Sequence, residues 1–159
     1  MPNSSPAEVA AQLRNMALTE FPNRIKTDRA YDGMSAVGVL METGYEQAVA
    51  TLAAFITGDA SIYLSSGGGV IGGQGHADIR IAARRFTQFA GVHVPEMSKC
   101  TDCPLPRFGQ TTFYVINANG IFTLTAPEQA LGGGSHEFSP LFHAGQYVIT
   151  LLRMSVQKK

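Results

Sequence analysis

The sequence predicts an α+β fold, in which one antiparallel sheet of about five strands is flanked by three helices. Strand-like runs follow one another through tight turns, and strands joined this way pair antiparallel, because a parallel pair needs a long crossover. Serine–proline pairs near both ends of the chain mark helix starts, and a third helical pattern lies between the strand-like runs. With 159 residues, the chain can bury a core as a single domain, residues 1–159, without disulfide or metal support.

The first helix is expected over about residues 5–20. Residues 5–8 (Ser-Pro-Ala-Glu) supply an N-cap serine, a proline at the first helical position and the glutamate of a capping box. Pro22 is expected to end this helix, because the residue before a proline is disfavoured in the α conformation. Residues 22–34 are therefore expected to form a connecting loop.

Two further helices are expected, a central one over about residues 76–90 and a C-terminal one over about residues 139–153. The C-terminal helix begins with Ser139 and Pro140, again a cap residue followed by a proline at the first helical position. The central helix carries apolar residues at helical spacing, which predict one buried face. The residues of this face are Ile79, Ala83, Phe86 and Ala90.

The sheet and the central helix are expected within residues 35–126. The run 47–56 is ambiguous, because its alanines favour a helix while its β-branched and aromatic residues favour a strand. A turn-like segment follows it, so a hairpin is preferred. The strongest hairpin signal is Asn119-Gly120, which suits a turn that needs positive φ. The expected strands are residues 36–41, 47–56, 61–64, 111–116 and 121–126, and residues 91–110 are expected to be irregular.

This order of elements resembles the profilin-like group of folds, and especially its roadblock/longin-type branch. The resemblance covers most of the chain and lies in element order rather than in a motif. It implies a homodimer with a small GTPase or a scaffold protein as partner, because roadblock-like domains typically dimerise and bind such proteins. Residues 38–45 and 67–72 are also similar to bacterial sequences, a similarity that implies no activity.

Composition and charge disfavour several classes of protein. Lys and Arg number 12, Asp and Glu number 12, and so no overall field would steer the chain to nucleic acid or anionic lipid. No run reaches the roughly 18 apolar residues of a membrane helix, and the first residues do not resemble a secretory signal. We therefore expect a cytoplasmic protein without nucleic-acid or membrane partners. A net charge of zero also makes self-association easy.

The glycine-rich segment, residues 65–76, lies between a strand-like run and the central helix. Gly67, Gly69 and Gly72 match the G-x-G-x-x-G pattern of dinucleotide-binding sites. Glycines in the would-be first helical turn and the lack of later strand–helix repeats argue against that interpretation. No Gly-Lys-Ser/Thr follows, as a P-loop would require. The glycines are expected to shape a bent crossover, with a backbone-lined contact to a ligand or partner as the alternative.

Cys100 and Cys103 form the single Cys-x-x-Cys pair of the chain. Two thiolates could hold one side of a zinc ion, but a closed zinc site needs four ligands. A redox pair usually lies at a helix start, and the prolines that follow Cys103 disfavour one there. Incidental loop thiols, a metal clip and a redox pair therefore all remain open. The four histidines show no zinc-binding spacing.

Three hypotheses about function follow. The first is a non-catalytic, homodimeric interaction module that uses an exposed hairpin, residues 111–126, or the central helix. The second is a small-ligand sensor that uses the glycine-rich segment, and the third is a metal or thiol enzyme that uses the cysteine pair. No cofactor is expected and no catalytic residues are assigned. Arg80, Arg84 and Arg85 form a basic patch that is either a solvated face or a site for an acidic partner. The residues expected to bind a ligand or partner are Gly67, Gly68, Gly69, Gly72, Gly73, His76, Arg80 and Arg84.

Overall fold

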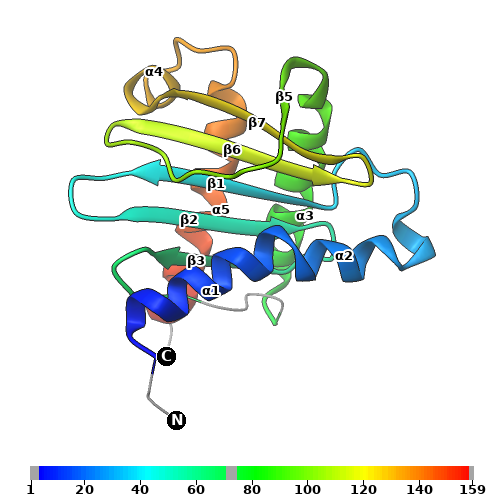
Figure 1. Cartoon of the computed structure of the whole chain (residues 1–159), viewed down its shortest axis with the longest axis horizontal. Coiled ribbons are helices and arrows are strands. Elements are labelled where there is room, and N and C mark those ends of the chain that lie inside the picture. Colours follow the sequence, from blue (N-terminus) through cyan, green and yellow to red (C-terminus); the bar gives the residue numbers. More distant parts are fainter. Residues whose placement is uncertain (1–3, 71–74, 158–159) are drawn as a thin grey trace.

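A computed structural model, which describes residues 4–70 and 75–157, shows a sheet of seven strands in the order β4-β3-β2-β1-β6-β7-β5 (Figure 1). All neighbouring strands pair antiparallel, so the predicted α+β class is confirmed. The predicted number of about five strands is wrong, because two short strands, β4 and β5, extend the sheet at its edges. The strands are β1 (Gly38–Gly44), β2 (Val49–Phe55), β3 (Ala60–Leu64), β4 (Gly69–Val70), β5 (Ser98–Cys100), β6 (Gln110–Asn117) and β7 (Gly120–Pro127).

Helices cover both faces of this sheet. Helices α3 and α5 lie on one face, and α1 and α2 lie against the opposite face of the β1–β3 half (Figure 1). The predicted set of three helices is incomplete, since α2 and the short α4 are additional. The helices are α1 (Pro6–Leu18), α2 (Glu20–Lys26), α3 (Ala77–Val92), α4 (Glu128–Gly132) and α5 (Ser139–Gln157), with 3-10 turns at Arg29–Tyr31 and Val94–Glu96.

The predicted start of α1 is confirmed by a complete capping box. The Glu8 backbone N–H donates to Ser5 Oγ at 3.1 Å, and the Ser5 N–H donates to Glu8 Oε1 at 3.4 Å. The expected loop over residues 22–34 is wrong at its beginning. The chain breaks at Thr19 (φ −123°, ψ −69°) and not before Pro22, which lies in the first turn of α2, where the missing N–H of a proline would have no helical partner.

Strand β1 lies in the middle of the sheet and is buried along its whole length. Its side chains alternate between two cores: Val39 and Met41 pack with α3 and α5, while Leu40 packs with α1 and α2. Burial on both faces explains why the chain is continuously apolar over residues 36–41. The ambiguous run 47–56 is a strand, as preferred, since β2 pairs with both β1 and β3.

The predicted apolar face of the central helix is confirmed, because Ile79, Ala83, Phe86 and Ala90 are each at most 1% exposed. Helix α5 packs beside α3 through Gly145. A Cβ at that position would lie 2.7 Å from Met41 Cε and 3.0 Å from Phe86 Cζ. The two helices and the central strand therefore meet in one tightly packed layer.

The predicted β6–β7 hairpin is confirmed, with Asn117 paired to Gly120 and φ of +130° at Gly120. The expectation that this hairpin is an exposed surface is wrong for its first strand, whereas most of β7 is partly exposed. Strand β6 lies between β1 and β7 and is buried from Thr111 to Asn117. Strand β5, within the region expected to be irregular, covers the other side of β7.

Candidate functional site

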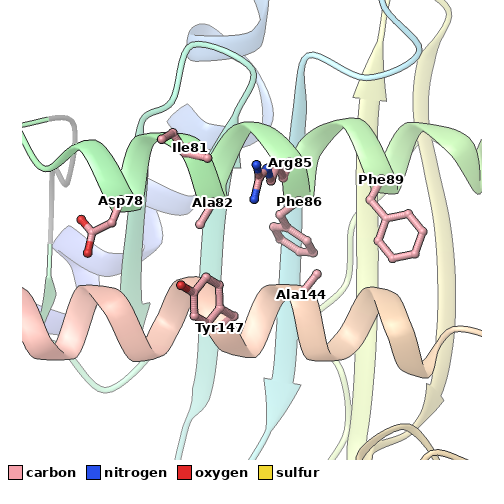
Figure 2. A pocket seen from close by; sticks show the side chains of 8 residues that line it. All are labelled: Asp78, Ile81, Ala82, Arg85, Phe86, Phe89, Ala144 and Tyr147. Carbon is pink, nitrogen blue, oxygen red and sulfur yellow. The ribbon is translucent and has the colours of Figure 1, made fainter.

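The main candidate site is a groove between α3 and α5, on the side of these helices that faces away from the sheet (Figure 2). It has a volume of about 510 Å³. Figure 2 shows Asp78 at one end and Phe89 at the other, with Tyr147 of α5 opposite Ala82 of α3. We call this site the α3–α5 groove; its lining also includes Ile81, Arg85, Phe86 and Ala144.

The groove is open because small residues lie where the two helices approach each other. Ala82 and Ala144 have no side-chain atoms beyond Cβ to fill the space between the ribbons. Larger apolar side chains stand beside it and remain in contact with solvent, with Ile81 48% and Tyr147 58% exposed. Val92, further along α3, is 67% exposed. Apolar side chains gathered on one exposed face are typical of a protein contact surface.

Two opposite charges flank this apolar surface on α3. Asp78 lies in the first helical turn, where its Oδ1 accepts a hydrogen bond of 2.8 Å from the Ile79 N–H and where the helix dipole favours a negative charge. Arg85 is two turns further along and is exposed. Across residues 4–70 and 75–157, neither side chain takes part in an ion pair.

The predicted basic patch is divided between two surfaces. Arg85 lines the groove, whereas Arg84 reaches the turn between β2 and β3, where its Nη2 donates to the Thr57 carbonyl at 3.3 Å. The stem of Arg80 packs against Gly58 of the same turn. His76 is the N-cap residue of α3, is exposed, and makes no capping hydrogen bond with its side chain. Of the predicted residues on this helix, Arg85 therefore lines the groove, whereas His76, Arg80 and Arg84 do not.

The first part of the glycine-rich segment, residues 65–68, forms the turn from β3 into β4. Gly67, Gly68 and Gly69 have φ of +115°, +88° and +151°, which side-chain-bearing residues rarely adopt. This supports the expectation that the glycines shape a bent backbone path. Gly68 and Gly69 line a second cavity of about 380 Å³ beside α1, together with Pro6, Val9, Leu13 and Tyr63. Gly72 and Gly73, also predicted as binding residues, lie outside the described part of the chain.

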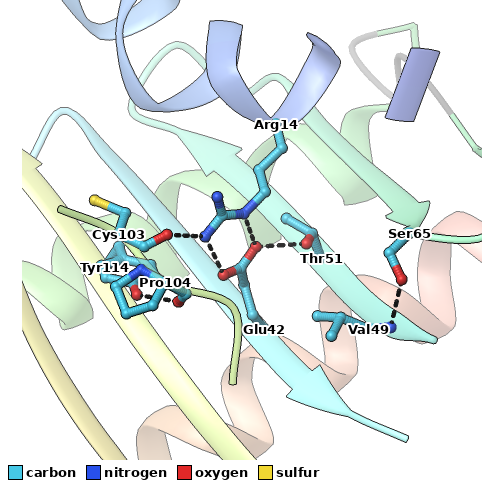
Figure 3. A network of polar contacts seen from close by, with 8 residues as sticks. All are labelled: Arg14, Glu42, Val49, Thr51, Ser65, Cys103, Pro104 and Tyr114. Carbon is cyan, nitrogen blue, oxygen red and sulfur yellow. Dashed lines mark hydrogen bonds and ion pairs between the residues drawn. The ribbon is translucent and has the colours of Figure 1, made fainter. Parts of the chain in front are cut away.

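A buried polar cluster lies on the opposite face, under α1 (Figure 3). Glu42 of β1 is 0% exposed, and Arg14 of α1 binds it through two contacts, Nε–Oε2 at 2.6 Å and Nη2–Oε1 at 2.8 Å. Arg14 Nη2 also donates to the Cys103 carbonyl at 2.7 Å, and Thr51 Oγ1 donates to Glu42 Oε2 at 2.6 Å. Burial acts to lower the pKa of Arg14, but the hydrogen bond and the charge of Glu42 outweigh it and raise that pKa.

This cluster has a structural role. Arg14 and Glu42 connect α1, β1, β2 and the 101–109 loop (residues 101–109, between β5 and β6), and both carboxylate oxygens accept hydrogen bonds from the protein itself. Tyr114 of β6 completes the connection, because its hydroxyl donates to the Pro104 carbonyl in the same loop. In the sequence, one signal points to the cluster: Glu42 directly follows three apolar residues of a strand that is buried on both faces.

The predicted cysteine pair lies beside this cluster, with Cys100 at the end of β5 and Cys103 in the 101–109 loop. Burial raises the pKa of Cys100, and burial together with the neighbouring Cys100 raises the pKa of Cys103 to about 12. Reactive thiols need a lowered pKa, so this environment does not favour a nucleophile. Among the residues that the structure describes, no group of three or more His, Cys, Asp and Glu side chains could hold a metal ion. A metal site at Cys100 and Cys103 therefore stays a prediction, with these two thiolates as the expected ligands.

The buried ion pair makes a prediction about stability. Glu42→Gln should lower the free energy of unfolding by about 3–5 kcal/mol, because it leaves the guanidinium of Arg14 buried without its counter-charge. The double variant Arg14→Met/Glu42→Leu should recover most of that loss, since apolar side chains can replace a buried pair. Denaturant unfolding at one fixed protein concentration measures both. A loss below about 1 kcal/mol in Glu42→Gln would contradict this role for the pair.

The raised thiol pKa values predict slow alkylation. Free cysteine has a pKa of about 8.5, so at pH 8 the Cys103 thiol should react with iodoacetamide at least about tenfold more slowly in the folded than in the unfolded protein, and the Cys100 thiol should also react more slowly. Because the pKa is higher in the folded state, the associated stabilisation is present below about pH 8.5 and is lost as the pH rises towards 12. Mass spectrometry of each cysteine peptide over time gives the two rates. Equal rates in folded and unfolded protein would show that the thiols are not protected.

Comparisons with protein-family models, curated proteins and solved structures found no match. The resemblance to the profilin-like folds therefore stays a prediction. Within residues 4–70 and 75–157, no helix has the length and apolar character needed to cross a bilayer. The conclusions on function accordingly depend on the surfaces and contacts described above.

Proposed function

We propose that this protein is a non-catalytic interaction module that acts as a homodimer, with the α3–α5 groove as its contact face. The observation that carries the proposal is the exposed apolar surface around this groove, where Ile81 and Tyr147 are about half exposed. Covering these side chains would remove apolar surface from water, which is the main favourable term in association.

The helix face is a better contact than a sheet edge. The edge strands β4 and β5 contain only two and three residues, and such short edges offer few unpaired backbone groups to another chain. The net charge of zero also means that two copies do not repel each other over long distances. The resemblance to roadblock-like domains adds a small GTPase or a scaffold protein as the proposed partner of the dimer, by analogy of fold.

The groove is tested by changing its most exposed aliphatic residue. Ile81→Glu should weaken dimerisation at least about tenfold, because a charge would have to be buried in an apolar contact. Its matched control is Phe108→Glu, which places the same charge at a 70% exposed apolar residue of the 101–109 loop, away from the groove. Sedimentation equilibrium over a range of concentrations measures the association. If the wild-type protein is monomeric at every concentration, the homodimer proposal is wrong.

A second candidate function is the binding of a small ligand beside the glycine turn. It is favoured by one observation, the cavity that Gly68, Gly69 and Tyr63 line together with the apolar side chains of α1. Such a lining suits a small, mainly apolar molecule that contacts the bare glycine backbone.

The ligand hypothesis is tested by thermal unfolding with a panel of small aromatic and aliphatic carboxylic acids. A binding compound should raise the unfolding temperature of the wild type, because it stabilises the folded state alone. Val9→Lys should abolish that rise without changing the unfolding temperature in buffer, since Val9 is 42% exposed. If no compound in the panel gives a rise, the cavity is not a site for this class of ligand.

A further inference from the structure

We infer, on the basis of the proposed homodimer, that α3 of one copy lies antiparallel across α3 of a second copy, so that each Asp78 pairs with the Arg85 of the other. Asp78 and Arg85 flank the apolar surface of α3 with the small Ala82 between them, and within residues 4–70 and 75–157 neither charge forms an ion pair. This arrangement specifies which residues of the two copies face each other. The register can therefore be wrong even if the protein forms a homodimer.

The spacing of the two charges matches a two-fold axis. Asp78 and Arg85 are seven residues apart, which is about two helical turns and about 10.5 Å along the helix, so both lie on one side of α3. In a symmetric dimer the same surface is used twice, and residue i meets residue j while j meets i. Pairing 78 with 85 therefore places the axis between Ile81 and Ala82. Both charges then find an opposite charge in one contact.

The residues at this axis are complementary in size. Ile81 projects from α3 and is 48% exposed, whereas Ala82, beside it, is 7% exposed and forms part of the groove floor. An antiparallel crossing sets each Ile81 against the Ala82 of the other copy. In Figure 2, the space between Ala82 and Tyr147 is where the Ile81 of a second copy would enter. A large side chain thus faces a hollow on both sides of the axis.

The charges of Asp78 and Arg85 also favour an antiparallel over a parallel crossing, and a second copy over a helix of uniform charge. A parallel crossing would place Asp78 against Asp78 and Arg85 against Arg85, and like charges in a contact are unfavourable. A partner with a uniformly acidic or basic helix would satisfy only one of the two residues. A second copy in the antiparallel orientation satisfies both, and this selects the chain itself as the occupant.

Charge reversal tests the register. Asp78→Arg and Arg85→Asp should each weaken dimerisation at least about tenfold, because each variant places two pairs of like charges across the contact. The double variant Asp78→Arg/Arg85→Asp should return the dissociation constant to within about threefold of the wild type, since it restores opposite charges at both places. Sedimentation equilibrium at low and high salt measures all four proteins. If the single variants dimerise like the wild type, or if the double variant is not restored, the register is wrong.

Cross-linking distinguishes failure of the register from failure of the dimer. In a Cys100→Ser/Cys103→Ser background, Ala82→Cys lies next to the axis and should be joined to itself by a short bismaleimide. Val92→Cys is the control, because antiparallel α3 helices place the two copies of residue 92 about 30 Å apart. Cross-linking at 92 but not at 82, in a protein that still dimerises and responds to Ile81→Glu, would overturn the register alone. A wild type that remains monomeric would overturn both proposals.

Discussion

The face of the sheet that α1 and α2 cover depends on the pairing of one buried carboxylate. Glu42 lies in the central strand with no exposed surface, and an unpaired charge there would cost several kcal/mol. Arg14 supplies the counter-charge from α1, so the helix must stay where its guanidinium reaches β1. The same guanidinium holds the Cys103 carbonyl and thereby fixes the 101–109 loop over the sheet. A single side chain thus positions two segments that are far apart in the sequence.

The two faces of the sheet differ in the kind of contact that holds the helices on them. The face under α1 and α2 is organised by polar contacts that are satisfied within the chain, and it offers little unused hydrogen-bonding capacity. The face under α3 and α5 is a mainly apolar core, in which Gly145 packs closely against Met41. The outer side of that helix pair keeps exposed apolar side chains and charges of both signs that form no ion pair within the described part of the chain. This distribution supports an interaction surface on the helix pair and a structural role for the buried ion pair.

Local signals in the sequence predicted the strongly patterned elements. The capping box and serine–proline start of α1, the face of α3 and the Asn-Gly turn each have a short-range physical cause, and the structure contains all of them. Helix α5 begins at Ser139 itself, so the expectation that this serine is the cap and Pro140 the first helical residue is wrong by one position. One error is local, because a proline is compatible with the first turn of a helix and Pro22 lies in the first turn of α2. The others have long-range causes, since β4 and β5 form where β3 and β7 offer them an edge. The sequence does not predict the groove, because apolar residues on a helix indicate burial against the rest of the chain. Only the fold shows that Ile81 and Tyr147 remain exposed to solvent.

The bond between Arg14 and the Cys103 carbonyl has a consequence for how the protein opens. If α1 detached alone, Glu42 would keep its charge in the core while its cation went into water, so this local opening is costly. Helix α1 and the 101–109 loop should therefore exchange their amide hydrogens as one cooperative unit with the central strands. The N-terminal helix is in this sense part of the folding core and not an appendage that could be removed.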